Sequence, residues 1–136
     1  MNIAFFLIPK QEVVTVNIEW TMRQALEKME YHRYKSIPVI DQQGHYIGVL
    51  TEGDLLWKLK SEQHLTFEDT PRIPLSNVPR HEKVEAISIN EKVDHMFLSV
   101  MERNFVPVVD DQGIFIGIIR RREIMEFYVN RLVIEE

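Results

Sequence analysis

The chain contains two copies of one pattern, and this internal repeat constrains its fold more than any other feature. Residues 37–50 align without a gap with residues 106–119, and residues 13–26 match residues 84–97. Four of the five glycines, and the prolines that precede the two copies, fall at paired positions. The pairs are Gly44 with Gly113, Gly48 with Gly117, and Pro9 with Pro79. Because scarce residues recur in register, the chain is a duplication of one structural unit.

Each copy predicts the same succession of a strand and a helix. A short strand is expected at residues 13–16 and again at residues 84–87. Apolar residues then recur with the spacing of one helical face. They are Met22, Ala25, Leu26 and Met29 in the first copy, and Val93, Met96, Phe97 and Val100 in the second. Thr21 and Gln24 have the spacing of a capping box, which places the start of the first helix.

The second part of each copy predicts a β-hairpin followed by a helix. Strand-like runs at residues 37–40 and 47–50 flank Asp41-Gln-Gln-Gly44, in which Asp and Gly suit the first and fourth positions of a type I turn. Residues 110–113 repeat this turn. Closing helices are expected at residues 52–60 and from residue 121 to about 132. Each copy is therefore predicted to be a β-α-β-β-α unit.

The size of one copy predicts that the two fold together. A unit of about 50 residues is too small to bury both faces of its sheet. We therefore predict an α/β (α+β) fold in which two pseudo-symmetric β-α-β-β-α repeats pack sheet to sheet. Residues 1–60 should hold the N-terminal segment and the first repeat, 61–77 a linker, and 78–136 the second repeat and C-terminal helix. The apolar residues 4–8 are interpreted as a buried first strand rather than a targeting signal.

Composition argues against several classes of function. The absence of cysteine excludes disulfides, thiolate metal sites and cysteine nucleophiles. A net charge of −5 disfavours general binding to nucleic acid, and no apolar run is long enough to cross a bilayer. The five histidines fit no metal spacing, and no nucleophile or P-loop motif is present. We predict a cytoplasmic protein that is not an enzyme, with no metal or catalytic cofactor and no nucleic-acid or membrane partner.

The landmarks of the repeat resemble a known family. Both copies contain x-Pro-Val-h-Asp followed by a turn glycine, and the first continues as Gly48-Val-Leu-Thr51-Glu-Gly-Asp54. Over nearly its whole length the chain is similar to the CBS-domain family, in which a tandem pair of repeats is called a Bateman module. The resemblance implies a stand-alone regulatory pair that binds an adenine nucleotide. The ligands known in the family include AMP, ADP, ATP, S-adenosylmethionine and cyclic di-AMP.

The resemblance also implies the residues of a ligand site. In the family, the Thr and Asp of this motif hydrogen-bond the ribose hydroxyls, a role that falls here on Thr51 and Asp54. The chemistry is suitable, because an ionised carboxylate accepts hydrogen bonds from both hydroxyls of a diol. The second copy has Arg120 and Glu123 at these positions and does not inherit the role. The implied walls of the cleft for the base are Val14, Thr15, Val16, Ser36, Ile37 and Pro38.

Two of these assignments have structural alternatives. Thr51 and Asp54 also have the spacing of a capping box at a strand-to-helix junction. In the basic run 120–122, two side chains at most can reach one phosphate, and we predict that Arg121 and Arg122 do so at the start of the helix. The alternative is that these arginines form local salt bridges with carboxylates such as Glu123 and Glu126.

The sequence therefore predicts a regulatory module that binds an adenine nucleotide in the cleft between the repeats and signals to a partner protein. A cyclic di-AMP receptor, and a structural dimerisation module with a vestigial nucleotide site, are the alternatives. The closing helices carry more apolar residues than one buried face needs, notably Trp57 and Tyr128. This surplus predicts a homodimer formed through these helices.

Overall fold

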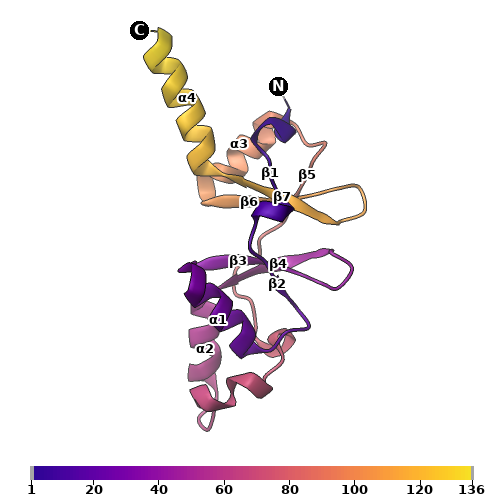
Figure 1. Cartoon of the computed structure of the whole chain (residues 1–136), viewed down its shortest axis with the longest axis vertical. Helices are drawn as coiled ribbons and strands as arrows, with labels where there is room; N and C mark the ends of the chain where they lie inside the picture. Colours follow the sequence, from indigo (N-terminus) through magenta and orange to yellow (C-terminus); the bar gives the residue numbers. More distant parts are fainter. Residues whose placement is uncertain (1, 136) are drawn as a thin grey trace. The chain divides into compact units, whose positions relative to one another are not determined.

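The computed structural model describes residues 2–135, which divide into two compact units. Residues 14–85 form one unit, which contains the first copy of the repeat. The second copy, from residue 86 onward, forms the other unit together with the residues before 14. Each unit combines a small sheet with two α-helices, which confirms the predicted fold class (Figure 1).

The first unit is built on a three-stranded sheet with the order β2-β3-β4. Strand β2 (Val16–Asn17) runs parallel to β3 (Ser36–Ile40), and β3 pairs antiparallel with β4 (Tyr46–Thr51). Helix α1 (Met22–His32) connects β2 to β3, and α2 (Glu52–Ser61) follows β4 directly. The core between sheet and helices includes Val16, Met22, Ala25, Met29, Ile37, Val39, Leu50 and Leu55.

The second unit repeats this arrangement and adds one strand at the edge of its sheet. The sheet order is β1-β7-β6-β5, with β5 parallel to β6 and β6 antiparallel to β7. The elements are β1 (Ile8–Pro9), β5 (Ile87–Ser88), α3 (Val93–Glu102), β6 (Phe105–Val109), β7 (Phe115–Arg120) and α4 (Arg121–Glu135). Strands β2 and β5 are shorter than the predicted runs and begin three residues later, because only these residues pair with the neighbouring strand.

The predicted local signals of the first helix and of both turns are confirmed. Thr21 accepts a hydrogen bond from the Gln24 amide at 3.2 Å, and the Gln24 side chain accepts one from the Thr21 amide at 2.9 Å. These bonds satisfy backbone donors at the start of α1 that have no partner within the helix. In the hairpin turns, Gly44 and Gly113 have φ values of 89° and 79°, which glycine adopts without strain.

The N-terminal segment packs in the second unit, whereas the sequence analysis grouped it with the first repeat. Ile3–Phe6 form a 3-10 helix, η1, instead of the expected strand, and Ile3 and Phe6 are buried in the core of the second unit. The ring of Phe6 lies 5.5 Å from that of Phe127 in an edge-to-face arrangement. Strand β1 then pairs with β7, where a Cβ on Gly117 would overlap the carbonyl oxygen of Ile8. Aromatic packing and this close backbone approach hold the segment on the second repeat.

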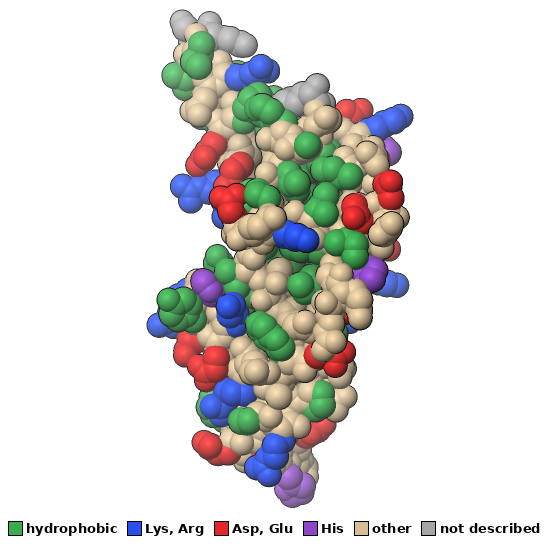
Figure 2. Space-filling view, turned by 45° about the vertical axis from the view of Figure 1, so that its right-hand side comes forward, with side chains coloured by type: hydrophobic (Ala, Val, Ile, Leu, Met, Phe, Trp, Pro, Cys, Tyr) green, Lys and Arg blue, Asp and Glu red, His purple; other side chains and the backbone are tan. Residues whose placement is uncertain are grey.

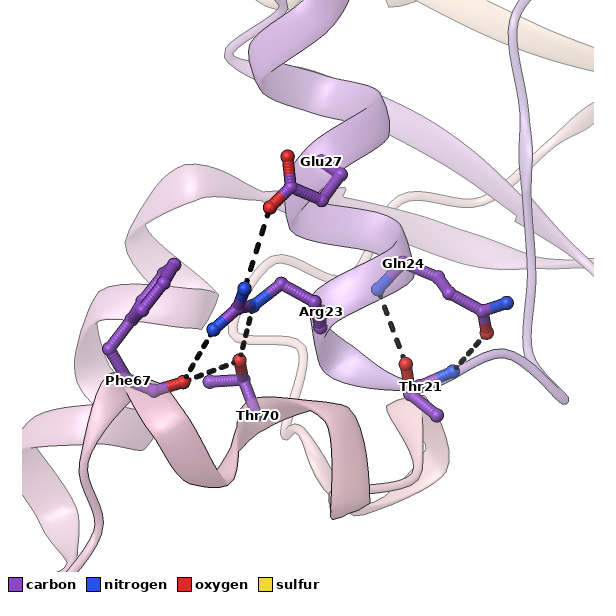
Figure 3. A network of polar contacts seen from close by, with 6 residues as sticks. All are labelled: Thr21, Arg23, Gln24, Glu27, Phe67 and Thr70. Atoms are coloured by element: carbon purple, nitrogen blue, oxygen red, sulfur yellow. Dashed lines mark hydrogen bonds and ion pairs between the residues drawn. The ribbon is translucent and has the colours of Figure 1, made fainter.

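The segment predicted as a linker is folded onto α1. It contains the 3-10 helices η3 (Phe67–Arg72) and η4 (Leu75–Asn77). Arg23 of α1 donates to the Thr70 hydroxyl at 2.8 Å and to the Phe67 carbonyl at 3.0 Å, and its guanidinium lies 3.8 Å from the Phe67 ring centroid (Figure 3). Thr70 and Leu75 are buried. The segment therefore belongs to the first unit and brings the residues that follow it back across β4.

Candidate functional site

The predicted ribose motif lies at the junction of β4 and α2. Thr51 is the last residue of β4 and the N-cap of α2. Its hydroxyl accepts a hydrogen bond from the Asp54 amide at 3.2 Å, and Asp54 Oδ2 accepts one from the Thr51 amide at 2.9 Å. The capping box that the spacing permits is therefore formed. The same two side chains stabilise the helix and are the ones expected to meet the ribose.

Asp54 carries more than a capping role, because its second carboxylate oxygen is also engaged. Oδ1 lies 2.9 Å from the His81 amide nitrogen, which donates to it, and 2.8 Å from Nδ1 of the His81 ring. The Asp54 side chain is only 1% exposed, whereas that of His81 is 54% exposed. A buried carboxylate is thus covered by a half-exposed ring. His81 was not among the predicted site residues, since it lies 27 positions from Asp54 in the sequence.

The electrostatics of the site keep Asp54 ionised. Burial by itself raises the pKa of the Asp54 carboxyl, but the hydrogen bonds from Thr51 and His81 outweigh it and hold the pKa below its usual value of 3.8. With Asp54 as an anion, the ring nitrogen that faces it carries a proton and donates. The site therefore holds a fixed negative charge at neutral pH.

His81 belongs to a short exposed segment, residues 79–83, which we call the strap. The buried residues Val78 and Val84 flank it. Next to His81, the Arg80 side chain passes over Gly48, so that a Cβ on this glycine would lie 2.9 Å from Arg80 Nε. Beyond the strap, the carbonyl of Val84 accepts a hydrogen bond from the Tyr46 hydroxyl at 2.5 Å. The strap is thus held against β4 on both sides of His81.

The two units use the glycine of the motif in corresponding ways. Gly117 of the second copy lies under β1, which contains Pro9, and Gly48 of the first lies under Arg80, which follows Pro79. In the second unit, the glycine allows the backbone of β1 to cross the sheet closely, whereas in the first unit it is the side chain of Arg80 that comes near the glycine. The paired prolines, Pro9 and Pro79, mark these two segments in the sequence. That the segments lie near the motif glycines becomes clear only from the structure, in which β1 pairs with β7.

The predicted phosphate ligands of the second copy are engaged locally. Arg122 pairs with Glu126 at 3.0 Å, and Arg121 donates to the side chain of Asn104 at 2.5 Å. Arg120 forms a salt bridge with Glu123, the residue that stands where the first copy has Asp54. The pairing of Arg122 with Glu126 raises the pKa of the guanidinium. A phosphate at Arg121 and Arg122 remains a prediction, and it requires these local contacts to be exchanged.

The predicted walls of the base cleft fall into two groups. The side chains of Val16 and Ile37 are fully buried in the core of the first unit, and Pro38 is buried as well. Val14, Thr15 and Ser36 are half-buried. Ser36 lies directly opposite Thr51 in the β3–β4 pairing, so that their side chains share one face of the sheet. Of the predicted wall residues, Ser36 is the one that this pairing places opposite Thr51.

Among the side chains that the structure describes, no group of three or more His, Asp or Glu residues could hold a metal ion. Within residues 2–135, no helix is long and apolar enough to span a bilayer. Three histidines instead pair with single carboxylates: His81 with Asp54, His45 with Asp41, and His95 with Glu91. Two surface pockets of about 460 and 330 Å³ lie along α1 and do not include Thr51 or Asp54.

Comparison with known proteins identifies the family. The CBS domain model matches residues 7–61 and 76–130. The chain belongs to the CBS-domain family. It contains two CBS domains, as the repeat and its motif predicted.

Several known proteins are similar to this CBS pair. Cyclic di-AMP receptor B of Bacillus subtilis is 24% identical over 92% of this chain and 84% of its own length. The CbpB protein of Listeria monocytogenes, solved in complex with c-di-AMP, superposes with a TM-score of 0.84 at 22% identity over 98% of both chains. Inosine-5'-monophosphate dehydrogenase of Methanocaldococcus jannaschii is 28% identical over 85% of this chain, which spans 22% of that enzyme. A protein of Methanopyrus kandleri is 29% identical over 88% of this chain, and the chain spans 59% of that protein's length.

Proposed function

We propose that this CBS pair is a regulatory module that binds an adenine nucleotide through Thr51 and Asp54 and signals its occupancy to a partner protein. The observation that carries the proposal is the Gly48–Asp54 motif, which holds an ionised carboxylate at a strand-to-helix junction. A fixed anion beside a hydroxyl suits the donors of a ribose, and the half-buried Ser36 lies on the same face as Thr51. No acid–base pair or nucleophile motif was found in the sequence, so a regulatory role suits the chain better than a catalytic one.

Within this proposal, the first candidate ligands are AMP, ADP, ATP and S-adenosylmethionine, and the alternative is cyclic di-AMP. The similarity to Cyclic di-AMP receptor B extends over 92% of this chain, and the CbpB structure contains c-di-AMP. A dinucleotide carries two phosphates, which gives Arg121 and Arg122 of the second copy a role that a nucleoside does not require. Arg122 is exposed and Arg121 is half-buried, so a phosphate must replace their present partners, Glu126 and Asn104.

We also propose a homodimer formed through the helices of the CBS domains. On α2, Leu56 and Trp57 are exposed, and on α4, Met125, Val129 and Leu132 are exposed. Figure 2 shows apolar side chains at the surface of both units. Tyr128 packs edge-to-face against the rings of Phe97 and Phe127 and remains partly exposed. Full burial of an exposed side chain of this size stabilises by roughly 1.5–3 kcal/mol, so covering these surfaces favours association.

Isothermal titration calorimetry with AMP, ATP, S-adenosylmethionine and cyclic di-AMP tests the proposed ligand class. Asp54→Ala should weaken binding of the tightest ligand about 10- to 100-fold, because a hydrogen bond to a charged group is lost. Gln24→Ala is the matched control, since it removes the corresponding side chain from the capping box of α1 in the same unit. Equal effects of the two variants, or no binding of any of these ligands to the wild-type protein, would contradict the proposal.

A further inference from the structure

Most of the hydrogen-bond acceptor positions of the Asp54 carboxylate are occupied by donors of the chain. An ionised carboxylate offers about four lone pairs for hydrogen bonds. Three point to donors of this chain: the amides of Thr51 and His81, and the His81 ring. Because the side chain is 1% exposed, a ribose hydroxyl reaches it only when a neighbour moves aside.

The ring of His81 is the neighbour that moves most easily. The amides of Thr51 and His81 are part of the backbone, and the strap is held by Val78, Val84 and the Tyr46 hydroxyl. The ring, by contrast, is 54% exposed, and Nδ1 gives it a single polar contact with Asp54. A rotation of the His81 side chain uncovers the carboxylate without displacing the strap.

We propose that His81 controls the affinity of the ribose site by occupying Asp54 in the absence of ligand, so that the ribose must displace its ring. This inference rests on the proposed nucleotide function and adds that a side chain of the protein itself competes with the ribose for Asp54. His81 and the ribose hydroxyls are donors for the same oxygen, and each excludes the other. In the second unit, Glu123 stands at the corresponding position and is paired with Arg120 of its own strand–helix junction.

The test compares nucleotide affinity in wild type, His81→Ala and His81→Asn by isothermal titration calorimetry. The probes are AMP and cyclic di-AMP, each paired with an analogue that lacks the free ribose hydroxyls. His81→Ala removes the ring and keeps the backbone donor, so the hydroxyl-bearing probe should bind about three- to tenfold more tightly. The Asn amide can donate from the position of Nδ1, and His81→Asn should therefore return the affinity to within about twofold of wild type.

His95→Ala is the matched control. It removes a ring that lies 2.8 Å from Glu91, with the same Nδ1–carboxylate geometry, in the other unit, and should leave every affinity unchanged. The affinity of the analogues should not respond to His81→Ala, because they carry no donor for Asp54. An equal gain for probe and analogue would overturn the inference, since the ring would then obstruct the ligand by its bulk alone.

Two further outcomes separate this inference from the function on which it rests. If His81→Ala leaves affinity unchanged or weakens it, while Asp54→Ala weakens binding as proposed above, the competition is refuted and the ribose site stands. If neither AMP nor cyclic di-AMP binds the wild-type protein or His81→Ala, the proposed function is refuted, and the competition with it.

Discussion

Replacement of Asp54 by Asn tests how much the buried carboxylate stabilises the first unit. Asn keeps the shape of Asp54 but has one acceptor oxygen, and its amide must then face one of the two backbone donors, Thr51 or His81. A buried donor left without an acceptor costs about 1–3 kcal/mol, and the remaining hydrogen bond loses its charge assistance. We expect the free energy of unfolding to fall by roughly 2–4 kcal/mol. Gln24→Ala, in the more exposed box of α1, should lower it by only about 0.5–1 kcal/mol.

The pH dependence of this difference identifies the charge as its cause. The pKa of Asp54 in the folded protein lies below its usual value of 3.8, so the unfolded chain binds the proton more readily. The stabilisation is therefore fully present above about pH 5 and is lost as pH falls through the folded pKa. Urea unfolding at about pH 6 and about pH 3 should show the gap between wild type and Asp54→Asn narrowing at the acidic value. A gap that stays constant, or one below about 1 kcal/mol at pH 6, would refute the account of Asp54 as an ionised anchor.

Two other predictions concern the fold and the assembly. Gly117→Ala should destabilise the second unit by roughly 1–3 kcal/mol in urea unfolding, because the new Cβ overlaps the Ile8 carbonyl and separates β1 from β7. Gly48→Ala is the control, because its new Cβ meets only the flexible side chain of Arg80, and it should change stability by less than about 0.5 kcal/mol. Equal losses of stability in the two variants would contradict the role given to Gly117. Size exclusion with light scattering should give the wild-type protein a mass of about twice the 16.2 kDa of one chain. Trp57→Glu, which changes an exposed side chain of α2, should return the mass to that of the monomer. A wild-type mass of one chain, with and without nucleotide, would exclude the dimer.

The local structure of each repeat could be predicted from the residues themselves. The apolar spacing of Met22, Ala25 and Met29 determines the buried face of α1, and Thr21 with Gln24 determines where the helix begins. The turns at Gly44 and Gly113 require a positive φ, which a glycine in register after Asp indicates directly. The ends of β2 and β5 could not be predicted, because a strand of two residues is defined by the partner with which it pairs.

Part of the site could also be predicted, because it too depends on residues that are close together in the sequence. Thr51 and Asp54 are close in sequence, and their motif is readable without coordinates. Their capping box and their expected contact with ribose require the same spacing, which explains why sequence alone leaves both roles open.

The sequence by itself determined the duplication, the order of strands and helices in each copy, and the motif at Gly48–Asp54, because these depend on neighbours within a few turns of the chain. Only the tertiary structure decided that residues 3–9 pack on the second repeat and that His81 covers Asp54. Both contacts join residues far apart in the chain and are selected by shape and by hydrogen-bond partners. Periodicity carries no information about either, since a half-exposed histidine in a polar segment has the same pattern whether or not a buried carboxylate lies beneath it.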